Sequence, residues 1–330
     1  AGEKSRFITQ LEIEQQPNHV INSTIYNAVL PEKAHEPITI DKNEAVLKRL
    51  HEIATEKGFS PSSLTNYIRN PLQFYMQRIL RINEADEVEE NIAVNTLGTI
   101  IHNALEELYD PYLNQFLALH HLEAMESKIE TVILKYFKEE YKEGEITKGK
   151  NLLAFEVAKR NVYNFLQLEK RAIQEDGDAI KVLFLEASLD CEITIDSLPF
   201  PIKIAGKVDR IEERNGEIRI VDYKTGKVDG NSLKITDFTD LTLDIKNEKI
   251  IQLLCYALMF ENHELNQNKE VLAGIISFKN MKGGFLPFGL GKGKNSELQI
   301  TTPILEDFKA ELKLLILEIF NPEIPFKEKV

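Results

Sequence analysis

The chain has 330 residues, 43% of them hydrophobic and 28% charged, which are ordinary values for a globular protein of one large domain or two small ones. The formal net charge of -13 argues against binding nucleic acid through the whole surface, although it allows a local basic groove. Two cysteines in apolar surroundings, Cys191 and Cys255, exclude a disulfide framework and favour a reducing cytoplasm. No apolar run approaches the ~20 residues of a membrane span, so no membrane association is expected.

The first half of the chain is predicted to be mainly helical. Residues 1–59 are poorly periodic, apart from a helix expected at 43–57, and are interpreted as a lead-in or linker segment. Residues 60–80 start with Ser-Pro, which favours a helix start, and Pro71 predicts a break between two helices. Further amphipathic helices are predicted at 94–122, 123–141 and 151–175.

Strand character begins at residue 181. A strand or strand pair is predicted in 181–195, and two alternating segments flank Asn215-Gly216, the preferred sequence of a two-residue hairpin turn. A helix at 247–262, a strand at 271–279, a Gly/Lys-rich loop and a helix at 304–320 follow. The sequence thus predicts an α/β fold with a central mixed β-sheet flanked by helices. Its domain is expected at 60–330, with a helical part at 60–180 and a sheet part at 181–330.

The predicted hairpin brings three charges together. With a two-residue turn, Arg214 pairs with Glu217, so Asp209 lies opposite Asp222, and Lys224 shares a face with Asp222. Like charges in opposed positions are destabilising unless something compensates for them. A divalent cation held by both carboxylates is one explanation. A solvated hairpin face neutralised by the lysine is the other, and spacing alone leaves both open.

The segments Gly206-Lys-Val-Asp209-Arg-Ile and Ile220-Val-Asp222-Tyr-Lys224-Thr-Gly resemble the core of the PD-(D/E)XK nucleases, and more narrowly their RecB-like branch. The resemblance implies a restriction-endonuclease-like core and metal-dependent hydrolysis of phosphodiester bonds. It assigns Asp209 and Asp222 as Mg²⁺ or Mn²⁺ ligands, Lys224 as the catalytic lysine, and the backbone carbonyl of Tyr223 as a further ligand. It also implies a DNA exonuclease that acts in repair and recombination.

Three further motifs match in the order of the family. Leu97-Gly98-Thr-Ile-Ile-His102 resembles a Gly-x-x-x-His motif whose histidine is a metal ligand, and Glu186 resembles a further acidic motif. Gln252-Leu-Leu-Cys-Tyr256 resembles a helix that lines the site and positions nucleic acid. Each also has an ordinary structural interpretation: a core histidine, a carboxylate paired with a lysine, and a buried hydrogen bond.

The path of the nucleic acid is expected along basic residues near the hairpin and along the loop at 279–294. Phe285 and Phe288 in that loop either stack on unpaired bases or fold into the core. The basic residues assigned to this path are Lys203, Lys207, Arg210, Lys227 and Lys282.

The sequence also departs from the resembling family. Many relatives hold an iron–sulfur cluster with cysteines, but here Asn70-Pro71 stands where they have Cys-Pro, and PEIPFKEKV near the end contains no cysteine. We therefore expect no cluster. The opening ITQLEIE resembles the middle of a larger protein, so the chain is compared with the C-terminal nuclease domain of an AddB-like helicase–nuclease, which implies a helicase partner.

Two other functions remain open from the sequence. One is a catalytically silent nuclease fold that binds DNA or acts as a scaffold, because a fold does not fix a function. The other is an unrelated metal-dependent phosphoesterase that acts on small substrates.

Overall fold

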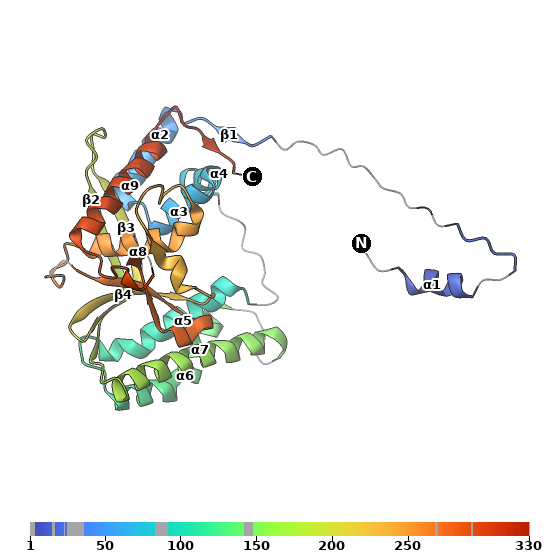
Figure 1. The fold of residues 1–330 in the computed structure, drawn as a ribbon, viewed down its shortest axis with the longest axis horizontal. Coiled ribbons are helices and arrows are strands. Elements are labelled where there is room, and N and C mark those ends of the chain that lie inside the picture. Colours follow the sequence, from blue (N-terminus) through green and yellow to red (C-terminus); the bar gives the residue numbers. More distant parts are fainter. Residues whose placement is uncertain are drawn as a thin grey trace. The chain divides into compact units, whose positions relative to one another are not determined.

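The computed structural model describes residues 4–14, 17–22, 24, 36–82, 92–141, 148–267, 270–291 and 293–329. The chain divides into two compact units, residues 1–36 and 37–330 (Figure 1). In the first unit, helix α1 (Arg6–Ile13) has no buried residue. The sequence EADEVEE at 84–90, whose acidic residues predict a solvated loop, falls outside the described residues. No helix in the described part of the chain has both the length and the apolar character that a membrane span requires.

The second unit is built on a five-stranded mixed sheet, as predicted. Its strand order is β2-β3-β4-β6-β7, and only β4 and β6 are parallel. The bounds are β2 Ile180–Ile193, β3 Ile202–Arg214, β4 Glu217–Lys224, β6 Leu272–Ser277 and β7 Phe285–Pro287. Because β4 and β6 are parallel, Lys224 and Ser277 end their strands at the same edge of the sheet.

The β3–β4 hairpin has the predicted turn and register. Asn215 and Gly216 both adopt positive φ, 55° and 85°, which is the backbone that a two-residue hairpin requires. Arg214 pairs with Glu217, and the ladder continues in that register to Arg210 opposite Val221.

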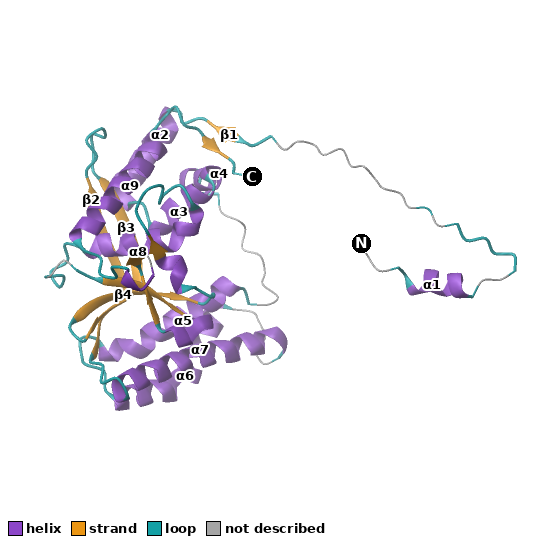
Figure 2. Cartoon of the chain, in the orientation of Figure 1, coloured by secondary structure: helices purple, strands orange, loops and turns teal. Residues whose placement is uncertain are grey.

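Helices cover both faces of the sheet (Figure 2). One face packs on α5 (Val94–Tyr109), α6 (Leu119–Glu140) and α7 (Gly149–Gln174), and the other packs mainly on α8 (Glu248–Phe260) and α9 (Thr302–Phe320). Successive residues of β4 alternate between the two cores: Ile220 belongs to the α8 and α9 side, and Val221 to the α5–α7 side.

Proline explains where the helices break. The predicted break at Pro71 is present, with α3 (Pro61–Arg69) ending before it and α4 (Pro71–Phe74) starting on it. The helix predicted at 94–122 is wrong in extent, because α5 ends at Tyr109. Pro111 follows in a 3₁₀ turn (Asp110–Tyr112), and a proline inside a helix would remove a hydrogen bond and clash with the preceding turn.

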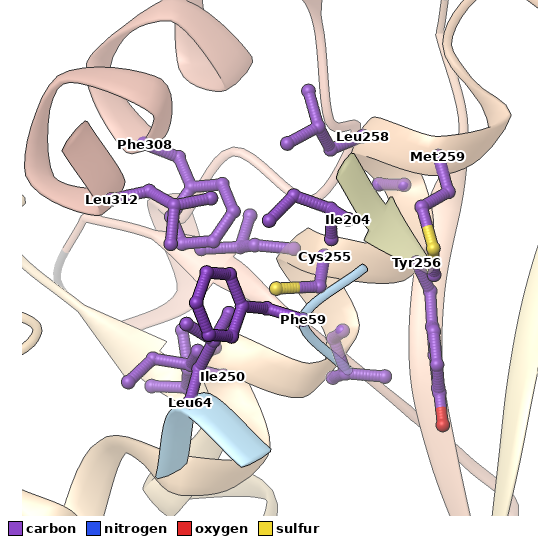
Figure 3. Packing of buried hydrophobic residues seen from close by; sticks show 14 of the residues in the cluster. Phe59, Leu64, Ile204, Ile250, Cys255, Tyr256, Leu258, Met259, Phe308 and Leu312 are labelled. Atoms are coloured by element: carbon purple, nitrogen blue, oxygen red, sulfur yellow. The ribbon is translucent and has the colours of Figure 1, made fainter. Parts of the chain in front are cut away.

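Residues 37–59, assigned from the sequence to the lead-in, pack with the sheet-containing unit. Helix α2 (Glu44–Glu52) continues into a π-helical turn, η1 (Ile53–Lys57), and buries Val46 and Leu50 in the core on the α8 side. Strand β1 (Thr39–Ile40) pairs with β9 (Phe326–Lys327). Figure 3 shows Phe59 among side chains of α8 and α9, including Cys255 and Phe308.

The remaining elements are short. They are the π-helical turn η2 (Tyr75–Ile79), the 3₁₀ turns η4 (Gly230–Leu233), η5 (Ile245–Asn247), η6 (Phe278–Gly283) and η7 (Gly293–Asn295), and the paired strands β5 (Lys234–Ile235) and β8 (Gly289–Leu290).

Candidate metal centre and catalytic site

Three potential metal ligands from three elements meet beside the β3–β4 hairpin. His102 of α5, Glu186 of β2 and Asp209 of β3 each offer one ligand atom, and these atoms lie within 4.8 Å of one another. His102 Nδ1 is 3.5 Å from Asp209 Oδ1 and 3.6 Å from Glu186 Oε1. The histidine therefore faces two carboxylates rather than being satisfied inside the apolar core.

Glu186 holds an unusual backbone conformation. Its φ is 47°, although it lies within a strand, and its neighbours Leu185 and Ala187 pair with Arg210 and Val208 on either side of Asp209. A non-glycine residue in this region is strained by about 1–3 kcal/mol, and such strain persists only where the surroundings enforce it. The strained backbone turns one carboxylate oxygen toward His102, and Lys207 holds the other at 2.9 Å.

The register of the turn predicts that Asp209 lies opposite Asp222, but the two residues do not pair in the ladder. Asp209 Oδ2 instead accepts a hydrogen bond from the backbone N–H of Tyr223 at 2.7 Å, and the regular ladder of the hairpin stops at Arg210 and Val221. The carboxylate of Asp209 thus binds the backbone N–H of the residue between Asp222 and Lys224. Its other oxygen, Oδ1, faces His102.

Asp222 is almost completely buried, with 1% of its surface exposed. Lys224 Nζ contacts both carboxylate oxygens of Asp222, donating a hydrogen bond to Oδ1 at 2.9 Å and lying 2.7 Å from Oδ2. Burial raises the pKa of Asp222 to about 6, which Lys224 opposes and the charge of Asp209 reinforces. Asp222 is not one of the three residues whose ligand atoms cluster, and its charge is offset by the lysine.

A chain of hydrogen bonds fixes the catalytic lysine candidate. Lys224 Nζ donates to Gln252 Oε1 at 3.0 Å, and Gln252 Nε2 donates to the hydroxyl of Tyr256 at 2.7 Å. Burial raises the pKa of Tyr256, so the phenol stays protonated. The amide that the sequence leaves without an assigned partner thus connects Lys224 to the tyrosine one helical turn further along α8.

The charge of His102 depends on its two carboxylates. Burial alone lowers the pKa of this imidazole, but contacts with Asp209 and Glu186 outweigh it and raise the pKa to about 10. The protonated imidazole compensates the carboxylates in this arrangement. A bound divalent ion would replace that proton, because a ligating histidine must be neutral.

The donor set fits a hard divalent cation. The carboxylates of Glu186 and Asp209 and the imidazole of His102 converge, whereas the buried carboxylate of Asp222 is paired with Lys224. Carboxylate oxygens are the ligands that Mg²⁺ and Mn²⁺ prefer. The backbone carbonyl of Tyr223 as a further ligand stays a prediction.

The predicted contact of Arg210 with nucleic acid is wrong. Arg210 is fully buried, and its guanidinium contacts Glu169 at 2.7 Å and Glu212 at 2.5 Å. It follows Asp209 in β3, and alternation directs it to the other face of the sheet, against α7. There it also donates to the hydroxyl of Tyr223 at 3.4 Å.

Three of the other four basic candidates lie on the surface, whereas Lys203 is half-buried and paired with Asp190 at 2.6 Å. Lys207, Lys227 and Lys282 are exposed, and Lys207 is engaged with Glu186. Phe288 is fully buried and Phe285 lies partly buried under Arg219, whose guanidinium carbon is 5.3 Å from the ring centroid. Of the two alternatives given for these phenylalanines, folding into the core is therefore the one that holds for Phe288.

Comparison with known proteins relates most of the chain to one superfamily. Residues 58–330 match the PD-(D/E)XK nuclease superfamily. An uncharacterized protein of Rickettsia felis is 23% identical over 75% of this chain and 27% of its own length. One of Rickettsia conorii is 24% identical over 54% of this chain and 20% of its own length. The chain thus spans about a quarter or less of these curated relatives.

Similarity to solved structures is distant. A structure described as "Crystal structure of SSO0001" shares 15% identity and a TM-score of 0.23, covering 77% of this chain and 86% of that one. The match of the superfamily extends over most of the chain, and it includes the hairpin with Asp209, Asp222 and Lys224. The chain belongs to the PD-(D/E)XK nuclease superfamily.

Proposed function

We propose that this chain is the catalytic module of a metal-dependent deoxyribonuclease that hydrolyses phosphodiester bonds. The observation that carries the proposal is the meeting of His102, Glu186 and Asp209 beside a buried Asp222–Lys224 pair. The superfamily supports a nuclease, and the polar groups that such chemistry requires are present in one place.

The residues divide the work between metal binding and positioning. His102, Glu186, Asp209 and Asp222 would hold one or two Mg²⁺ or Mn²⁺ ions, with Glu186 the least closely matched motif. When bound, such an ion supplies a Lewis acid and lowers the pKa of a water.

Lys224 is the group assigned to the attacking water or to the charge that develops on the phosphoryl oxygens. Gln252 and Asp222 accept hydrogen bonds from its ammonium and so fix its position before substrate arrives. Tyr256 holds Gln252 in turn. A preorganised donor of this kind requires little rearrangement during the reaction.

The finer assignment rests on the sequence motifs. Within this proposal the chain is a RecB-like nuclease similar to that of AddB-like proteins, acting as an exonuclease in repair and recombination beside a helicase domain or subunit. Lys207, Lys227 and Lys282 are its proposed contacts near the hairpin.

The first test is cleavage of end-labelled single- and double-stranded DNA with Mg²⁺ or Mn²⁺, with EDTA as the control. We expect metal-dependent cleavage that is lost in Asp209→Ala and Asp222→Ala. A folded wild type that neither cleaves DNA nor binds metal would support the silent DNA-binding or scaffold function instead. Cleavage of small phosphodiesters but not of DNA would favour a phosphoesterase.

A further inference from the structure

A cationic groove starts at the candidate site and leaves it in a direction that the sequence motifs do not indicate. One hollow of about 690 Å³ is lined by Lys224 and Gln252 and extends over α3, α4 and η2. A second, of about 300 Å³, shares Gln77 and Arg78 of η2 with the first and reaches α2 and η1. We call the two adjoining hollows the cationic groove.

The charge of this groove opposes that of the whole chain. The first hollow is lined by Lys224, Arg69, Arg78 and Lys249, and the second adds Arg49, Lys57 and Arg81. Among the described residues that line either hollow, Glu248 is the one acid. Arg49 is paired with Glu52 and Lys224 with Asp222, but the other five cations still outnumber the one acid that lines the groove. The chain overall has 53 acidic and 40 basic residues, so this excess of cations marks a site for a polyanion.

Several of these cations are available for a ligand. Glu248 is already contacted by Arg69 and by Lys249. Arg78 and Arg81 are exposed and make no ion pair with any described residue. Arg78 lies in the π-helical turn η2, a rare distortion that often occurs at functional sites.

Amide side chains add uncharged hydrogen-bonding groups beside the cations. Asn66, Gln73, Gln77 and Asn95 line the hollow that reaches Lys224. Cationic and amide groups in one hollow suit a strand of nucleic acid, since cations contact its phosphates and amides contact its sugars and the edges of its bases.

We propose that the cationic groove binds the sugar–phosphate backbone of a single nucleic-acid strand and leads it to Lys224. The inference rests on the proposed function and names the substrate track of the same site. The track runs over residues 49–81, part of which lies before the segment matched by the superfamily. It is separate from the path through Lys207, Lys227 and Lys282.

The test is binding of a fluorescent single-stranded DNA in EDTA, so that affinity is measured without cleavage. An oligonucleotide of about 20 nucleotides exceeds the ~4–16 that one single-strand-binding fold occupies. The variant is Arg78→Gln/Arg81→Gln in the full chain. Loss of two phosphate contacts should weaken binding about tenfold at ~0.1 M salt and reduce the slope of log affinity against log salt by about 1.4.

The matched control is Lys128→Gln/Lys138→Gln, which removes the same charge from exposed positions of α6, a helix that Figure 1 places far from α4. We expect wild-type affinity and salt slope for it. Thermal unfolding of all proteins checks the fold. Should Arg81→Gln disturb the fold, Arg78→Glu alone is compared with Lys128→Glu.

Equal losses in the groove variant and the α6 variant, or wild-type binding by the groove variant, would overturn the inference. The proposed function fails separately. Binding through the groove without cleavage under any metal condition leaves the track standing and removes the nuclease. Metal-dependent cleavage with unchanged binding by the groove variant leaves the nuclease standing and removes the track.

Discussion

At the residue scale, the state of the site depends on how Asp222 is charged. Its pKa is raised to about 6 by burial, so ionisation is unfavourable in the folded protein despite the adjacent Lys224. An acid whose pKa is raised in the folded state contributes stability that is fully present below its pKa in the unfolded chain, here 3.8. That contribution is lost as pH rises through the folded pKa of about 6. The metal-free protein thus carries an unfavourable charge at neutral pH, which bound metal would compensate.

We therefore predict that Asp222→Asn changes the pH dependence of stability. A shift of about two pKa units corresponds to about 3 kcal/mol. In EDTA, the free energy of unfolding of the variant relative to wild type should rise by up to that amount between about pH 4 and pH 7. Denaturant unfolding across this range measures it, and saturating Mn²⁺ should reduce the difference by stabilising wild type. A difference that does not change with pH would show that the pKa of Asp222 is not raised in the folded protein.

A buried ionic cluster supports the hairpin from the side of the sheet that packs on α5 and α7. Arg210 of β3 contacts Glu169 of α7 and Glu212 of its own strand, and all three side chains are buried. Tyr109 of α5 donates a hydrogen bond to Glu169. The cluster joins the helices to the strand that carries Asp209, and Tyr223 links the two faces through its hydroxyl and its backbone N–H.

Arg210→Met should lower the free energy of unfolding by about 3–5 kcal/mol, because it leaves buried carboxylates without their cation. Arg210→Met/Glu169→Gln should recover part of that loss, since one uncompensated carboxylate becomes neutral. Denaturant unfolding of the three proteins measures both effects. A single variant within ~1 kcal/mol of wild type would show that the cluster contributes little.

The sequence predicts the features of these elements that have local causes. Asn215-Gly216 sets the hairpin register because both residues accept positive φ, and Pro71 breaks the helix through its missing amide hydrogen. Asn70, noted only as a departure from a cysteine, caps α4 by accepting from the backbone N–H of Leu72. The strained backbone of Glu186 and its meeting with His102 depend on packing across the fold, which no local pattern reports.

Alternation of side chains along β3 also predicts the orientation of Arg210. Arg210 follows Asp209, so a strand that directs the aspartate toward the site must direct the arginine away from it. The cationic groove had no comparable signal, because Lys224 of β4 and Lys249 of α8 join the five cations of residues 49–81 only in the folded chain.

At the scale of the whole molecule, the unit that contains the site begins before the predicted domain boundary. Phe59 pairs with Ile204 of β3, and its N–H donates to Lys203 at 2.8 Å. Lys42 donates to the backbone carbonyl of Glu318 near the end of α9 at 2.8 Å. Such contacts join residues 37–59 to both the sheet and the last helix, although a two-residue strand and a π-helical turn give no clear periodicity in sequence.

A chain of residues 60–330 should therefore be much less stable than one of residues 37–330. It loses five buried apolar side chains from one core, each worth about 1.5–3 kcal/mol for the larger types, against a typical total stability of about 5–15 kcal/mol. The lost side chains are Val46, Leu50, Ile53, Ala54 and Phe59. Thermal unfolding of both chains measures the difference. Equal melting temperatures would restore the boundary at residue 60.

The role of Lys224 is tested by the cleavage rate of Lys224→Ala, with Mn²⁺ affinity measured on the same sample. We predict that cleavage of labelled DNA falls about a hundredfold or more, as for loss of a preorganised transition-state donor, while metal is still bound. Cleavage by Lys224→Ala at the wild-type rate would contradict it and would place the chemistry elsewhere in the chain.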